Sequence, residues 1–442
     1  MGIIQYLVGI NGSTTIMFWS ALLLALAYTN GDGENNLSTT ATQQQQQQQH
    51  DSYDVLIVGG SISGLSAALS LGRSLRRVLV VDAGQPCNLP SPHAQNLLGF
   101  DDHFNDNIPQ QPPPQQPKGH CQNSDIATID VGGEEEGGGG RGIPPSQLHA
   151  FAKSDVGQYP TVDLVSGKVT YLDVNNEDEK STNNEEVFYP IHAEYSITED
   201  ETTKIVRARK LILATGMLDL LPPIPGLNEC WGKTAIHCPY CDGYEFRHQK
   251  TALIHVTSTS TVVSMASILS KFTSDLTIVG KYTSSNVFST EQLEQFQTHR
   301  VHLYLEHEVV ELDHTDGILE AIVLDNGERL LMDVVYVRPP KQQSPIITDT
   351  FLLPPSSSSP SPSPSPSLHL EMDARGYIVV DPATQQTSID HVYAVGDCTD
   401  SNRALSIAMA SGTRAAKMMN YELSMDDWTK AVKTQKLGDR DV

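Results

Sequence analysis

The residues best suited to chemistry lie in one segment, His237-Cys238-Pro239-Tyr240-Cys241-Asp242. Two cysteines separated by two residues at the start of a helix can form a disulfide, and the helix stabilises a thiolate, the nucleophile of thiol-disulfide exchange. One sulfur can then exchange with a dithiol or disulfide substrate while the other meets a redox cofactor. Asp242 can move the proton that each exchange step requires. The segment therefore predicts a redox-active dithiol with Cys238, Cys241 and Asp242 as catalytic residues.

Other interpretations of this segment stay open. A zinc half-site with Cys230 and His237 would need ligands at a recognisable spacing, and the chain has no second C-x-x-C, so no metal is expected. The pair could also be an inert structural disulfide. Asp242 could cap the helix, and His237 could lower a thiol pKa, although we favour a scaffold role for this histidine.

A glycine-rich turn near the N-terminus indicates a bound dinucleotide. Residues 54–58 form an apolar strand candidate, and Gly59-Gly60-Ser61-Ile62-Ser63-Gly64 leads into a helix expected over residues 64–75. A helix start offers N–H groups to a pyrophosphate, and glycines let the backbone approach it. Ser61 takes the place of the second glycine of G-x-G-x-x-G, so the match is imperfect. Asp82 ends the next strand, where it can bind ribose hydroxyls.

Two further strands end in small-residue turns of the same kind. Ala214-Thr215-Gly216 ends one strand, and Gly396-Asp397 follows another near the C-terminus, before a helix expected over about residues 403–419. Asp397 can bind ribityl or pyrophosphate-associated hydroxyls, and the helix would point its N-terminal end at the flavin. Three such segments predict FAD rather than NAD. The predicted FAD-binding residues are Gly59, Gly60, Ser61, Ser63, Gly64, Asp82, Ala214, Thr215, Gly216, Gly396 and Asp397.

The elements around these turns predict an α/β fold. Short apolar strands alternate with helical stretches, which is typical of parallel sheets. We expect two Rossmann-like, three-layer domains, the FAD domain being discontinuous and the NAD(P)-type domain inserted in it. The expected bounds are a leader at 1–50, the FAD domain at 51–225 and 371–423 with a low-complexity insertion at 105–142, the dithiol domain at 226–343, a Ser/Pro-rich linker at 344–370 and a polar tail at 424–442.

Composition narrows the partners and the compartment. A net charge of −24 argues against a nucleic-acid partner. Residues 16–28 are mostly apolar, too short to span a bilayer comfortably, and contain an A-x-A pattern, but no basic residue precedes them. We expect a secretory signal and a secretory or secreted protein, while a soluble cytoplasmic extension and an uncleaved anchor, which alone would give membrane contact, stay open. Cys87 and Cys398, beside cofactor turns, are expected to be small buried residues.

The order of segments resembles the low-molecular-weight thioredoxin reductase family and, within it, the fungal FAD-dependent dithiol oxidases that form gliotoxin-type disulfides. The resemblance covers most of residues 52–423 outside the insertions and is carried by residues 59–69, 71–77, 81–88 and 219–231. It implies a homodimer. It also implies that Cys238 attacks the substrate, that Cys241 forms the flavin adduct, and that Asp242 is the acid-base carboxylate.

The second nucleotide fingerprint of the reductases is missing. Residues 251–263 contain no glycine, and residues 280–286 carry one lysine where the reductases place arginines for the NADPH 2′-phosphate. NADPH is therefore a doubtful cofactor. The sequence predicts oxidation of a dithiol substrate, small molecule or protein, with oxygen as acceptor. An NADPH-dependent disulfide reductase and an inactive flavin-fold binding protein are the alternatives.

Overall fold

The computed structural model describes residues 52–98, 101–102, 141–174, 188–199, 202–282, 287–352 and 369–438. The signal-like residues 16–28, the rest of the leader, nearly all of the 105–142 insertion and the core of the Ser/Pro-rich linker lie outside these ranges, so the predictions made for them stay predictions. Within the described ranges, no helix has both the length and the apolar character needed to cross a membrane.

The first sheet combines a parallel part with an antiparallel part. Its strands are β1 (Ser52–Val58), β2 (Val78–Asp82), β5 (Val162–Val174), β6 (Ile191–Ile197), β7 (Thr203–Leu213) and β18 (Val392–Ala394), in the order β1-β2-β5-β6-β7-β18 with a further β1–β7 pairing. Strand β2 runs parallel to β1 and to the start of β5, whereas β6 is antiparallel to both β5 and β7. The antiparallel pairing with β6 extends β7 back to Thr203.

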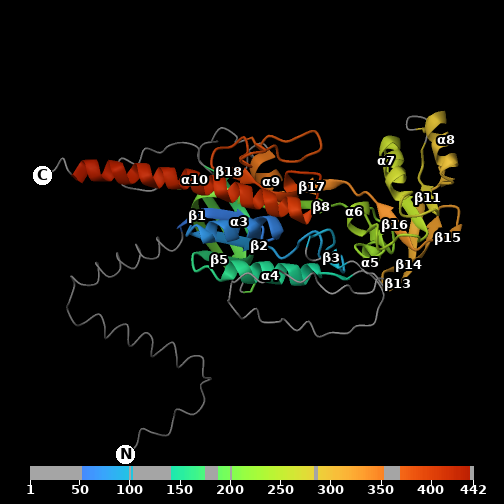
Figure 1. Cartoon of the computed structure of the whole chain (residues 1–442), viewed down its shortest axis with the longest axis horizontal. Helices are drawn as coiled ribbons and strands as arrows, with labels where there is room; N and C mark the ends of the chain where they lie inside the picture. The colour runs from blue at the N-terminus through green and yellow to red at the C-terminus, as the bar shows by residue number, and fades with distance from the viewer. Residues whose placement is uncertain are drawn as a thin grey trace, which may run out of the picture. The chain divides into compact units, whose positions relative to one another are not determined.

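In the described part of the chain, this sheet is packed by helices α3 (Ile62–Arg73), α4 (Pro145–Gly157) and α10 (Leu405–Gly438). Helix α10 lies along α3 (Figure 1), and a Cβ on Gly412 of α10 would collide with the carbonyl oxygen of Ser63. Strands β1 and β2 are almost wholly buried, as expected for parallel strands covered on both faces.

Helix α10 is much longer than predicted. We expected it to end near residue 419 and a polar tail to begin at 424, yet the helix runs on to Gly438. Polar contacts hold the extension on the domain: Arg76 donates hydrogen bonds to Asn420, Ser424 and Asp427. Composition alone indicated a tail because these partners are separated from Arg76 by more than 340 residues.

The second sheet is parallel throughout and confirms the predicted fold class. Its order is β12 (His302–Tyr304), β11 (Leu276–Val279), β10 (Thr251–Ile254), β16 (Val334–Val337) and β9 (Ala235–Ile236). Helices α7 (Thr259–Leu269) and α8 (Thr290–Thr298) follow β10 and β11, with Ser258 and Ser289 as N-caps. A smaller antiparallel sheet contains β13 (Val309–Thr315), β14 (Ile318–Leu324) and β15 (Arg329–Leu331).

Short elements complete the chain. These are β3 (Asp101–Asp102), β4 (Arg141–Gly142), β8 (Met217–Asp219), α5 (Leu227–Cys230), α6 (Pro239–Asp242), β17 (Lys341–Gln343), α9 (Pro345–Ile347), the π-helix η1 (Thr348–Leu352) and the 3-10 helix η2 (Gly396–Cys398). Strands β8 and β17 pair antiparallel where the chain enters and leaves the segment that holds the second parallel sheet.

Candidate active site

The predicted FAD turns come together at the ends of their strands. Gly59 follows β1 in the sequence and has φ +110°. Its backbone lies so close to the end of β7 that a Cβ would collide with the carbonyl oxygen of Ala214. A Cβ on Gly60 would meet the side chain of Asp82, and one on Gly64 would overlap the carbonyl oxygen of Gly59. Only glycines permit these three close contacts. The absence of side chains at these positions leaves the turn open to a dinucleotide.

The C-terminal turn joins the same cluster. Gly396 has φ +75°, and a Cβ there would lie 2.5 Å from Oγ of Ser63, which is buried in the first turn of α3. The Gly396 N–H donates to Oγ of Ser411 at 2.9 Å, and Ser61 is the N-cap of α3. Gly216 turns with φ +66° into open space. These positions lie at the carboxyl ends of parallel strands, where α/β folds bind ligands.

The glycine cradle fits a flavin dinucleotide. Asp82 and Gly60 line one pocket with Leu164, Val165 and Ser166, so an acid for ribose hydroxyls stands beside the turn for the pyrophosphate. Residues 214–216 and 396–397 would hold the ribityl and flavin part. FAD would supply a two-electron acceptor beside the dithiol.

Arg403 is a site residue that motif reasoning missed. Its buried guanidinium donates Nε–H to Oδ2 of Asp397 at 2.9 Å. Its two terminal nitrogens donate to the two carboxylate oxygens of Asp219 at 2.8 and 3.2 Å. Burial alone would lower the pKa of Arg403. The hydrogen bonds to Asp219 and the nearby anionic groups outweigh burial and raise this pKa above its ordinary value. The predicted flavin residue Asp397 is therefore tied to strand β8.

Cys87 does not have the predicted buried environment. Cys87 is exposed because residues 86–91 form a surface turn beside the cofactor site. Its Sγ lies 3.6 Å from Oδ2 of Asp397. Cys398 is buried as expected, and burial raises the pKa of its thiol to about 12. A thiol with this pKa stays protonated at neutral pH and is a poor nucleophile.

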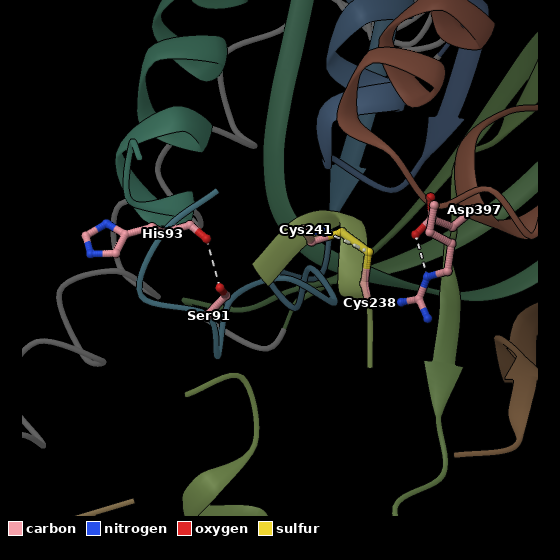
Figure 2. The surroundings of a disulfide bond; sticks show 6 residues. Ser91, His93, Cys238, Cys241 and Asp397 are labelled. Carbon is pink, nitrogen blue, oxygen red and sulfur yellow. Dashed lines mark hydrogen bonds and ion pairs between the residues drawn. A yellow bond between two sulfur atoms is a disulfide. The ribbon is translucent and has the colours of Figure 1, made fainter. Parts of the chain in front are cut away.

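Cys238 and Cys241 are joined by a disulfide, with Cα atoms 5.3 Å apart. Cys238 is the N-cap of α6, and its Sγ accepts a hydrogen bond of 3.1 Å from the N–H of Cys241. Figure 2 shows Asp397 on the Cys238 side of the disulfide, and Ser91 and His93 on the Cys241 side. Among the described residues, no three His, Cys, Asp or Glu side chains gather as a metal site. The pair therefore has the spacing and the helix-start position of a disulfide suited to thiol-disulfide exchange.

Asp242 has the properties of a proton-transfer group. Burial, with repulsion from Glu245 added, raises the pKa of Asp242 to about 7. The N-cap of α6 is Cys238 and its C-cap is Gly243, so the alternative that Asp242 caps this helix is wrong. Behind it, Tyr336 is buried on β16, and burial together with the two carboxylates raises the pKa of its hydroxyl. A carboxyl group with a pKa near neutrality can both give and take protons.

Comparison with known proteins identifies the family. Residues 53–415 match the family model described as pyridine nucleotide-disulphide oxidoreductase. The chain belongs to this family. It is 27% identical to thioredoxin reductase aclD of Aspergillus oryzae, over 86% of this chain and 98% of that protein. It is 24% identical to thioredoxin reductase tcpT of Claviceps purpurea, over 84% of this chain and 95% of that protein.

Solved structures show the same fold. The crystal structure of HlmI has a TM-score of 0.64 and 24% identity, covering 88% of this chain and 97% of that one. Putative thioredoxin reductase TrxB from Bacillus anthracis has a TM-score of 0.62 and 19% identity, covering 85% of this chain and 99% of that one. The protein is thus an FAD-dependent disulfide oxidoreductase, and the resemblance to thioredoxin reductases drawn from its sequence is confirmed.

In this pyridine nucleotide-disulphide oxidoreductase, His237 has the character of a scaffold residue. Its ring stacks on Trp231 at 5.7 Å between centroids. Burial and the positive charge of Arg403 lower the pKa of His237 to about 4. The imidazole is therefore neutral at physiological pH and provides no cation to stabilise a thiolate at Cys238.

In this oxidoreductase the turn after β10, where reductases have a second nucleotide fingerprint, is contacted by an aromatic side chain. The hydroxyl of Tyr282, a buried residue after β11, donates to the carbonyl oxygen of Val256 at 2.9 Å. Phe288 packs on the Tyr282 ring with centroids 4.8 Å apart. Lys281, the single cation predicted here, pairs with Glu308 and Asp325 at 3.1 and 3.0 Å. Residues 283–286 of this loop lie outside the described ranges.

Proposed function

We propose that the protein oxidises a dithiol substrate to a disulfide, with FAD as the internal electron acceptor and dioxygen as the final one. The observation that carries this proposal is the contrast between two sites of one chain. The dithiol and its proton-transfer carboxyl are in place, whereas Tyr282 stands against the turn through which a reductase would bind the pyrophosphate of NADPH.

The exchange chemistry needs only the disulfide and a proton acceptor. A substrate thiolate attacks Sγ of Cys238, the Cys238–Cys241 bond breaks, and Cys241 leaves as a thiolate. The second substrate thiolate attacks the substrate sulfur of the mixed disulfide, which closes the substrate disulfide and releases Cys238 as a thiolate. The substrate loses two electrons and two protons, and Asp242 is the group placed to accept a proton. FAD, held by the glycine turns, would supply the acceptor for the electron pair, and dioxygen would be the final acceptor, reduced to hydrogen peroxide.

Physical features of the second domain support an electron source other than NADPH. His255 has φ +52° in the turn after β10, where the first glycine of a fingerprint would stand, and its bulk hinders close approach of a phosphate. Lys281 is already neutralised by two carboxylates. An arginine fork binds a phosphate with paired hydrogen bonds that a lysine engaged elsewhere cannot replace.

The second candidate is an NADPH-dependent disulfide reductase, and it is favoured by the names of the fungal relatives, which are called thioredoxin reductases. The test is anaerobic reduction of the bound flavin by dithiothreitol and, separately, by NADPH, followed by re-aeration. The oxidase predicts bleaching by the dithiol, no bleaching by NADPH, and peroxide in proportion to the flavin on re-aeration. Bleaching by NADPH alone would establish the reductase instead.

We also infer that the chain forms a homodimer through the outer face of α10. Tyr421, Met425, Trp428 and Val432 are exposed at spacings of four, three and four residues, so they share one face of the helix. The spacing is that of a coiled-coil seam, which an identical helix can complement. Trp428 is 73% exposed, an unusual situation for a tryptophan in contact with water alone.

We further infer entry into the secretory pathway, on the strength of residues 16–28 alone. Disulfide formation suits exported compartments, which tolerate oxidants. Sequencing the N-terminus of the protein purified from its native host tests this: a terminus downstream of residue 27 supports the inference, and a terminus at residue 1 or 2 contradicts it.

A further inference from the structure

Helix α4 presents two polar side chains near Asp82, the residue predicted to bind the ribose of FAD. His149 and Lys153 are four residues apart, so they lie one above the other on the same face of the helix. Nζ of Lys153 is 2.6 Å from Oδ2 of Asp82. Lys153 also lines the pocket formed by Gly60, Asp82 and strand β5, which makes this face of α4 a wall of the dinucleotide site.

Asp82 is fixed by three donors, the Lys153 ammonium and the backbone N–H groups of Gly84 and Gly60, and keeps room for a ligand. Its Oδ1 accepts the N–H of Gly84 at 2.9 Å, while Oδ2 faces Lys153. Burial alone would raise its pKa, but the hydrogen bonds from Lys153 and the backbone hold the pKa of Asp82 below its ordinary value. An ionised carboxylate has about four acceptor sites, so one remains for a ribose hydroxyl. Lys153 therefore orients an ionised acceptor without using up its capacity.

His149 has a buried nitrogen that calls for a partner. The residue is 9% exposed, and within the described part of the chain its Nε2 has no hydrogen-bond partner. Burial lowers the pKa of His149, and the charges of Asp82 and Lys153 also act on it, so the neutral ring lies near both. A neutral imidazole has one donor and one acceptor, and leaving one of them buried and unsatisfied costs free energy.

We propose that Lys153 and His149 bind the adenosine end of FAD: Lys153 positions Asp82 for the ribose hydroxyls, and Nε2 of His149 forms a hydrogen bond with the adenosine. The two side chains would then make the site selective for the dinucleotide over FMN, which lacks the adenosine. This inference depends on the protein being an FAD enzyme and is independent of whether the substrate is oxidised or reduced.

The experiment is titration of apoprotein with FAD, FMN and ADP, following quenching of flavin fluorescence or the heat of ADP binding. Lys153→Met should weaken FAD and ADP binding about 10-fold, or about 1.4 kcal/mol, and leave the Kd for FMN unchanged. Lys153→Arg should recover most of the affinity. Lys168→Met, which removes an exposed lysine from β5, is the matched control and should bind all three ligands as the parent does.

His149 is tested by two substitutions. His149→Phe should weaken FAD and ADP binding several-fold without affecting FMN, and His149→Gln, which keeps a donor and an acceptor, should lie between it and the parent. If the Phe variant does not fold, the Gln variant and the Lys153 pair decide the matter. Equal losses for FAD and FMN, or unchanged FAD and ADP affinity in the Lys153→Met protein, would overturn the proposal.

Discussion

The Cα of Gly64 in helix α3 packs so closely on the carbonyl oxygen of Gly59 that a methyl group on Gly64 would overlap it. Gly59 in turn contacts the backbone of Ala214 on the neighbouring strand. The pyrophosphate turn, the start of α3 and the end of β7 are therefore one packed unit, in which a displacement of α3 alters the whole cofactor cradle.

Replacing Gly64 by valine should abolish FAD retention, because the helix must move away from the turn to accommodate the side chain. The measurement is the ratio of flavin to protein absorbance after purification. Gly157→Ala is the control, since a Cβ there has no neighbour within 4 Å, and this variant should stay yellow. A Gly64→Val protein that keeps a full complement of FAD would contradict the placement of the cofactor.

Cys238→Ser and Cys241→Ser should each abolish dithiol oxidation while leaving FAD bound, because the sulfurs take part in exchange whereas the FAD turns lie on other elements. The family resemblance assigns Cys241 to the flavin, so Cys238→Ser should show a thiolate-to-flavin charge-transfer band and Cys241→Ser should lack it. Turnover and the visible spectrum are recorded on the same samples. Parental activity in either variant would refute the dithiol assignment.

The activity should depend on pH through Asp242, whose pKa burial raises to about 7. Dithiol oxidation needs a proton acceptor, so the rate of the parent relative to Asp242→Asn should rise through pH 7 and level off above it. Taking the ratio cancels the ionisation of the substrate thiol. Glu245→Gln removes the repulsion that adds to the shift, so its midpoint should move to lower pH. Identical pH profiles for parent and Asp242→Asn would exclude Asp242 from proton transfer.

The same residue predicts a stability effect of definite sign. The carboxyl group titrates near pH 4 in the unfolded chain and near 7 in the folded protein, so the folded state binds the proton more tightly. Between these values the parent loses stability as the pH rises, and above pH 7 the full penalty of a buried charge remains. The melting temperature of Asp242→Asn should therefore rise relative to that of the parent between pH 4 and 7. Above pH 7 the difference between the two melting temperatures should stay constant.

Contiguous motifs explain which parts of the site were predictable from the sequence. The FAD turns and the C-x-x-C pair are short segments whose spacing alone determines their local geometry: the glycine turns meet at the strand ends, and the two cysteines form a disulfide. Contacts between distant residues left no such signal. Arg403 and Asp219 are separated by 184 residues, and the pairing depends on where the chain crosses between the first sheet and the second.

The length of α10 and the exposure of Cys87 were missed for the same physical reason. A polar helix is stabilised by the residues it lies against, and its partners Arg76 and Arg209 are more than 200 residues away in the sequence. Cys87 is exposed because its surface turn is set by packing against Gly232, where a Cβ would meet the backbone of Pro90. Neither relationship leaves a local pattern.

Trp428→Glu should convert a dimer into a monomer, because a charge in the middle of the seam on α10 would have to be buried without a partner. Light scattering after size-exclusion chromatography gives the mass directly. Lys417→Glu, on the same helix but outside the apolar set, is the control and should remain dimeric. A monomeric parent, or a dimeric Trp428→Glu protein, would remove α10 from the interface.

The electron donor should be a dithiol and not NADPH, because Tyr282 and Val256 are hydrogen-bonded across the turn that a pyrophosphate would need and Lys281 is held by two carboxylates. Losing two or three charge-assisted hydrogen bonds, at roughly 1.5 to 3 kcal/mol each, weakens NADPH binding by several orders of magnitude. Anaerobic stopped-flow reduction of the flavin, with a dithiol or with NADPH, measures the discrimination between the two electron donors.

The Tyr282→Ala variant separates steric from electrostatic causes. It should open the turn and still leave NADPH a slow reductant, since no arginine fork is restored. Rapid reduction of the parent by micromolar NADPH would make the protein a reductase and overturn the oxidase proposal.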